Sequence, residues 1–288
     1  MANSKLILVE GIPGSGKTTT ARFVCDWLEQ HGQFAILFQE GDWNHPADFE
    51  SVACLDEHDY AEIRAQFPDQ TEFLAQHARQ EDGDWYFSYQ KMQSEHGAQV
   101  PDKLFEDLAH FEIYNLPAEK HQRLLLQNWQ KFAARAVADQ VVYVFECCFL
   151  QNPITTLLAC HNLSIETVHQ HILALAESVK ALQPKMIYLA PDNPRLTLDN
   201  IRKERPQEWA DYVTGYLTEQ EYGKAHGLNG FEGVIQFYTI RQSLELAFLP
   251  TLPMPSITIS DVADWQIRYG YLESFLEMGV GNQNTILQ

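Results

Sequence analysis

The chain has 288 residues, 45% hydrophobic and 20% charged, and this length and composition suit a globular protein with a sizeable core. Its 20 Lys and Arg residues against 39 Asp and Glu residues give a formal net charge of −19, which disfavours a nucleic acid or an anionic membrane as partner. The sequence contains no stretch of about 18 apolar residues, so it predicts no membrane span. An apolar strand pattern that starts at Lys5 leaves no room for a signal peptide, so we expect a cytoplasmic protein.

The first predicted elements flank a glycine-rich segment. Residues 5–10 form a short apolar run that predicts a buried strand, and residues 16–31 carry apolar residues at helical spacing. Between them, residues 11–18 read Gly-Ile-Pro-Gly-Ser-Gly-Lys-Thr, which matches the pattern G-x-x-x-x-G-K-[ST] without a mismatch. A strand before the pattern and a helix after it is the context in which such a loop binds phosphate. The sequence therefore predicts a nucleoside triphosphate site.

Each part of this pattern has a physical role in phosphate binding. Gly14 and Gly16 allow backbone conformations and close contacts that a Cβ would resist. Lys17 can reach the β- and γ-phosphates, and the Thr18 hydroxyl can bind Mg²⁺. The residues that we expect to bind the phosphates are Gly11, Pro13, Gly14, Ser15, Gly16, Lys17, Thr18 and Thr19.

Further apolar runs predict four more strands, at residues 34–38, 141–145, 185–190 and 256–260. Helical patterns separate them, so the fold class is α/β, with a parallel sheet covered by helices on both faces. Residues 47–140 are rich in aromatic residues and predict an insertion of about five helices, which we expect to bind the acceptor. The aromatic run at residues 85–89 is interpreted as core of this insertion, with a stacking platform for the acceptor as the alternative.

Three stretches resemble the thymidylate kinase and deoxynucleoside kinase group of P-loop small-molecule kinases. They are residues 10–19, residues 187–189 with 197–205, and residues 257–260 with Asp264 and Trp265. The resemblance implies a single P-loop NTPase domain over residues 1–288, a three-layer sandwich. Its five-stranded parallel sheet would have the order 2-3-1-4-5, numbering the predicted strands along the chain. It also implies phosphoryl transfer from ATP with Mg²⁺, and a lid-like segment at residues 191–206.

Carboxylates at the ends of two predicted strands are candidates for metal binding and catalysis. Glu146 ends the 141–145 strand, and with Thr18 it is the expected metal ligand. Glu40 and Asp42 follow the 34–38 strand, where the resembling deoxynucleoside kinases keep their catalytic base. Which of the three acids is base and which is metal ligand stays open. The sequence departs from the group at Cys147, where those kinases have an arginine.

Basic residues in the lid-like segment are the remaining candidates. Arg202 and Arg205 are expected to stabilise charge on the transferred phosphoryl group, and Arg195 to bind the nucleotide, because the lid folds over ATP in the resembling kinases. Arg241 either reaches the site or pairs with a buried acid.

The predicted activity is Mg²⁺-dependent transfer of the ATP γ-phosphate to a hydroxyl or phosphate of a small molecule, with a nucleoside-like or nucleotide-like acceptor favoured. One alternative is a regulatory P-loop protein that hydrolyses ATP or GTP, and another is a toxin-like kinase of a sugar nucleotide. The only expected partner is the small-molecule acceptor.

Overall fold

The computed structural model describes residues 4–260, 265–278 and 285–287. The chain divides into two compact units, one formed by residues 1–40 and 129–288 and the other by residues 41–128. Asp264, one of the residues that carry the family resemblance, lies outside the described residues. Among the described residues, no helix is both long and apolar enough to cross a bilayer.

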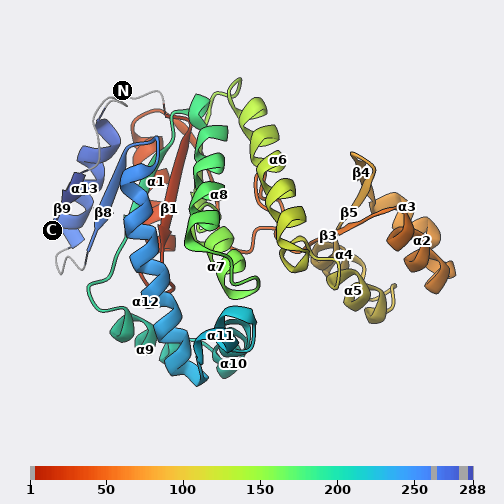
Figure 1. The fold of residues 1–288 in the computed structure, drawn as a ribbon. Helices are drawn as coiled ribbons and strands as arrows, with labels where there is room; N and C mark the ends of the chain where they lie inside the picture. Colours follow the sequence, from red (N-terminus) through yellow and green to blue (C-terminus); the bar gives the residue numbers. More distant parts are fainter. Residues whose placement is uncertain (1–3, 261–264, 279–284, 288) are drawn as a thin grey trace. The chain divides into compact units, whose positions relative to one another are not determined.

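A six-stranded parallel sheet forms the centre of the first unit (Figure 1). Its strands, in spatial order, are β2 (Phe34–Phe38), β6 (Val141–Glu146), β1 (Leu6–Gly11), β7 (Lys185–Leu189), β8 (Ser256–Ile259) and β9 (Thr285–Leu287). The five predicted strands lie side by side in the spatial order that we expected. Counted along the chain, however, the order is 2-6-1-7-8-9 and not 2-3-1-4-5, because the insertion contributes three strands and β9 adds a sixth to the sheet.

Both faces of this sheet are buried, which explains why its strands are continuous apolar runs. Successive side chains on a strand point to opposite faces. Ile7 and Val9 of β1 therefore share one face, where they pack in a core cluster with α1 (Lys17–Gln30) and α13 (Trp265–Glu277).

Helices α6 (Ala118–Ala136), α8 (Ile165–Ser178) and α12 (Gly230–Phe248) lie on the other face (Figure 1). The ring centroids of Trp129 in α6 and Phe145 in β6 are 5.8 Å apart. The Tyr188 hydroxyl of β7 donates to Glu245 of α12 at 2.5 Å. Helices thus cover both faces of the sheet, as the sequence predicts.

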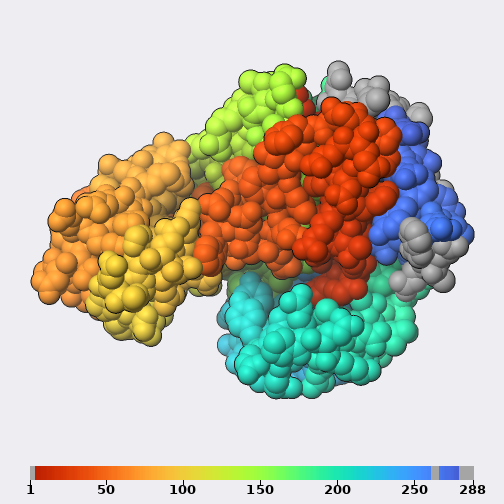
Figure 2. Space-filling model, turned by 180° about the vertical axis from the view of Figure 1, so that it is seen from behind, coloured from red at the N-terminus to blue at the C-terminus, as the bar shows by residue number. Residues whose placement is uncertain are grey.

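The remaining helices of the first unit lie at or near the carboxyl ends of the strands. They are α7 (Gln151–Ala159), α9 (Pro194–Glu204), α10 (Gln207–Thr218) and α11 (Glu221–His226). The predicted lid-like segment corresponds to α9 and the residues on either side of it. On the face drawn in Figure 2, the teal segment that contains α9 and α10 lies beside the red N-terminal residues.

The second unit combines helices with a small antiparallel sheet of order β3-β5-β4. Its strands are β3 (Val52–Leu55), β4 (Arg79–Glu81) and β5 (Asp84–Ser88), and its helices include α2 (Glu57–Gln66), α3 (Thr71–His77), α4 (Tyr89–His96) and α5 (Asp102–Ala109).

The insertion at 47–140 contains five helices, α2 to α6, as predicted, but its three-stranded sheet was not predicted. Asp82 and Gly83 both have positive φ, 54° and 90°, and form the two-residue turn that joins β4 to β5. An Asp-Gly pair is a strong hairpin signal that helical periodicity does not detect. The aromatic run at 85–89 is core as expected, since Phe87 and Tyr89 are buried with α2 and α5.

Candidate nucleotide-binding site

The glycine-rich segment connects β1 to α1 through a tight loop. The Ser15 N–H donates to the Ile12 carbonyl at 3.2 Å, and Gly16 occupies the position before the helix with φ 92°. Gly14 also has a positive φ, 80°, and a Cβ at this residue would lie 3.1 Å from the Thr197 methyl group of α9. The loop thus needs glycine at Gly14 and Gly16 for conformation, and at Gly14 also for its close approach to the lid-like segment.

Lys17 is buried at the start of α1, and its Nζ lies 3.2 Å from the Ile12 carbonyl oxygen. The first N–H groups of a helix have no partner inside the helix, and they carry a partial positive charge. Lys17 and these N–H groups therefore place positive charge at the end of the loop, which can attract an anion such as phosphate. Thr19, the next expected phosphate ligand, is exposed.

Thr18 and Glu146 meet at the carboxyl ends of two adjacent strands. β6 pairs with β1 in parallel, which brings Glu146 beside the loop, and the Thr18 hydroxyl donates to Glu146 Oε1 at 2.7 Å. Burial raises the pKa of Glu146, although the Thr18 hydrogen bond and the Lys17 charge act in the opposite direction. Glu146 Oε2 is buried without a hydrogen-bond partner. A hydroxyl and a carboxylate with a spare oxygen suit Mg²⁺, which prefers oxygen ligands, so these two residues fit the metal that the sequence predicts.

An open pocket of about 370 Å³ adjoins this pair. Its lining residues are Thr18, Gln39, Glu40, Glu146, Arg205 and Trp209. Glu40 follows β2 and accepts a hydrogen bond of 2.9 Å from the Gln151 side-chain amide. The pocket therefore combines two carboxylates, one guanidinium and one aromatic ring next to the glycine-rich loop.

The three arginines of the lid-like region have different surroundings. Arg205 lines the pocket. The Arg202 guanidinium lies 4.5 Å from the centroid of the Phe231 ring. Arg195 forms an exposed ion pair with Glu232, in which Nη1 and Oε2 are 2.9 Å apart. The structure thus brings only Arg205 of the three to the pocket.

Asp42 belongs to the second unit. Its carboxylate accepts the Asn44 N–H at 2.8 Å, which is a local turn interaction.

A buried polar network lies behind the loop. Arg241 of α12 is 1% exposed, and its Nη2 donates to the Gly11 carbonyl at 3.1 Å. Arg241 also forms an ion pair with the completely buried Glu245, in which Nε and Oε1 are 3.0 Å apart. Its Nη2 lies 3.4 Å from the Gln151 side-chain oxygen. Arg241 therefore pairs with a buried acid and also contacts the first residue of the loop. Because arginine can only donate, Gln151 presents its oxygen to Arg241 and its NH₂ group to Glu40.

Glu10, the residue before the loop, holds the start of α7. Its fully buried carboxylate accepts the N–H groups of Phe149, Leu150 and Gln151 at 2.8–3.1 Å. Burial raises the pKa of Glu10 to about 7. Burial also raises the pKa of the Cys147 thiol well above its usual value, so this cysteine is a poor nucleophile.

Sequence reasoning did not find four residues at or next to the site: Glu10, Gln151, Trp209 and Arg268. The sequence could have indicated Glu10, because an acid in an otherwise apolar strand needs buried hydrogen-bond partners. The other three lie in ordinary helical patterns, and only the folded chain brings them to the loop.

No protein-family model matches this sequence, and a search of curated proteins found no significant match.

Proposed function

We propose that this protein is a Mg²⁺-dependent kinase that transfers the γ-phosphoryl group of ATP to a small molecule. One observation carries the proposal: Thr18, at the start of the helix that follows the glycine-rich loop, donates its hydroxyl to Glu146 on the neighbouring strand. Lys17 and the N–H groups of the loop would bind the phosphates, and Thr18 and Glu146 would hold Mg²⁺. Mg²⁺ would neutralise charge on the β- and γ-phosphates.

The adjoining pocket favours a kinase over a protein that only hydrolyses nucleotide. The acceptor hydroxyl oxygen would form a bond to the γ-phosphorus while the bond from that phosphorus to the β-phosphate oxygen breaks, releasing ADP. Glu40 would take the hydroxyl proton, and the Gln151 side-chain amide, which donates to its carboxylate, would orient it. Arg205 would stabilise negative charge on the transferred group.

Trp209 supports an acceptor with a ring, such as a nucleoside. It lines the same pocket as Glu40, and an indole ring buries a planar partner well by stacking. A ring that stacks on Trp209 with its hydroxyl toward Glu40 would place the reacting oxygen near the glycine-rich loop.

The Lys17→Ala variant tests the proposal. Wild-type protein should bind Mg²⁺–ATP and turn it over, and Lys17→Ala should lower turnover by about 10²-fold or more, because Lys17 acts on the charge of the transferred group. Lys224 is exposed on α11, so Lys224→Ala is the matched control and should keep wild-type turnover.

Turnover is measured as ADP release, with candidate nucleosides present and absent, and the products are separated by chromatography. A phosphorylated nucleoside supports the kinase, whereas inorganic phosphate alone under all conditions supports the regulatory hydrolase. Wild-type protein that binds no Mg²⁺–ATP would contradict both.

A further inference from the structure

Arg268, on the first turn of α13, lies against the glycine-rich loop. Its Nη2 donates to the Thr20 hydroxyl at 3.1 Å and lies 3.5 Å from the Ser15 carbonyl oxygen. A Cβ at Gly16 would be 3.4 Å from the same nitrogen, so the guanidinium packs on the loop backbone where α1 begins. Gly16 is required for its positive φ, and Arg268 packs in van der Waals contact beside it.

Positive charge is concentrated around this turn. The buried ammonium of Lys17 and the positive end of the α1 dipole lie at the loop, and the guanidinium of Arg268 contacts it, in a chain with a net charge of −19. A phosphate anion bound at this loop would be attracted by both cations and by the helix dipole. A guanidinium can pair with two oxygens of one phosphate group, which makes phosphate the anion that fits best.

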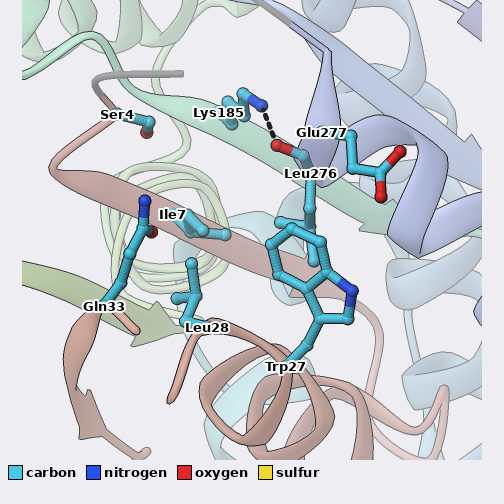
Figure 3. Close-up of a pocket in the computed structure, with 8 residues that line it drawn as sticks. All are labelled: Ser4, Ile7, Trp27, Leu28, Gln33, Lys185, Leu276 and Glu277. Carbon is cyan, nitrogen blue, oxygen red and sulfur yellow. Dashed lines mark hydrogen bonds between the residues drawn. The ribbon is translucent and has the colours of Figure 1, made fainter. Parts of the chain in front are cut away.

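Contacts at both ends of α13 hold Arg268 in place. Next to Arg268, Tyr269 stacks on Phe23 of α1 with ring centroids 4.1 Å apart. At the other end, Lys185 of β7 donates to three carbonyl oxygens, those of Phe275, Leu276 and Met278, at 2.8–3.0 Å. Figure 3 shows the Lys185 ammonium pointing to the Leu276 carbonyl. The first turn of α13 is therefore fixed relative to α1 and the sheet.

We propose that Arg268 binds a phosphate group of the nucleotide held by residues 11–18, and that α13 positions it there. This rests on the proposed function, and it adds a cationic residue that lies far outside the loop motif in sequence. Because the guanidinium recognises phosphate and not the nucleoside, its loss weakens binding of pyrophosphate as much as binding of ADP.

The test measures binding of ADP and of pyrophosphate, each with Mg²⁺, by titration calorimetry. Arg268→Gln should weaken binding of both by about 10-fold or more, and Arg268→Lys, which keeps the charge but loses the planar fork, should lie between Arg268→Gln and wild type. Thr20→Val removes one hydrogen-bond acceptor of Arg268 but leaves the guanidinium, and it should change binding by less than about 3-fold. Lys180→Gln is the control, since Lys180 is a cation in an exposed ion pair with Glu177 and belongs to no part of the site, and it should bind like wild type.

Three results would overturn the inference and leave the proposed function standing. Unchanged affinity of Arg268→Gln for ADP would show that Arg268 does not contact the nucleotide. Weaker binding of ADP with normal binding of pyrophosphate would place Arg268 at the nucleoside. Equal losses in Arg268→Gln and Thr20→Val, together with equal falls in melting temperature, would show that Arg268 only supports the loop. Wild-type protein that binds neither ligand would refute the proposed function itself, and this inference with it.

Discussion

Replacing Gly11 by alanine should destabilise the first unit because there is no room for a Cβ. Gly11 ends β1 with φ +146°, a conformation that alanine rarely adopts. A Cβ there would lie 2.5 Å from the Leu189 carbonyl oxygen of β7 and 2.8 Å from the Ser15 hydroxyl oxygen. Leu189 O belongs to the backbone of the strand that pairs with Gly11, so it cannot move without disturbing the sheet.

Two effects add up in Gly11→Ala. Forced overpacking typically costs about 1–3 kcal/mol, and holding a non-glycine residue in a disfavoured backbone region costs about 1–3 kcal/mol. The expected loss is therefore about 2–6 kcal/mol of the free energy of unfolding, a large share of the stability of most domains.

The matched control is Gly32→Ala. Gly32 follows α1 with φ +74°, and a Cβ there would meet no atom within 4 Å, so this variant should lose only about 1–2 kcal/mol through backbone strain. Urea denaturation followed by circular dichroism measures both variants against wild type. Equal losses in the two variants would mean that the close contact of β1 and β7 at Gly11 does not limit the residue size there.

Two further predictions concern buried ionisable groups. Lys185→Met should lower the free energy of unfolding by about 2–4 kcal/mol, because three carbonyls at the end of α13 lose their donor. Burial lowers the pKa of Lys185 from 10.5 to about 8, so between these pH values the folded protein releases a proton that the unfolded chain keeps. Wild type therefore gains stability over this range, and the free energy of unfolding lost in Lys185→Met should increase with pH. A loss that does not change with pH in urea denaturation would contradict this. For Glu10, burial raises the pKa from 4.5 to about 7, so its contribution to stability is fully present below pH 4.5 and is lost as the pH rises to 7. The stability of wild type relative to Glu10→Gln should therefore fall by an amount on the order of 3 kcal/mol over this range, and parallel stability curves of the two proteins from pH 4.5 to 7 would refute the reasoning.

Local sequence determined the central elements because their signals are short-range. The apolar runs at 5–10, 34–38, 141–145, 185–190 and 256–260 each became a strand of the parallel sheet. Glycines and a lysine at fixed spacing between a strand and a helix define the loop, since its conformation depends on a few adjacent residues. The meeting of Thr18 and Glu146 also followed from sequence, because the carboxyl ends of parallel strands lie at one edge of a sheet.

The small sheet of the second unit was missed although its signal was present. Asp82-Gly83 specifies a tight turn, but strands β4 and β5 are short, and the aromatic residues beside the turn occur in helices and strands alike. Periodicity over a few residues cannot distinguish the two, so the helical patterns around this segment dominated the prediction.

Only the tertiary structure decided which distant residues complete the site. Arg195, Arg202 and Arg205 look equivalent in sequence, yet only Arg205 lines the pocket, since the side-chain positions depend on how α9 and α10 pack. Arg241 and Arg268 reach the loop from helices that follow it by more than 200 residues. Such contacts depend on the register and orientation of packed helices, which are set by the shape of the whole core and not by any short segment of the chain.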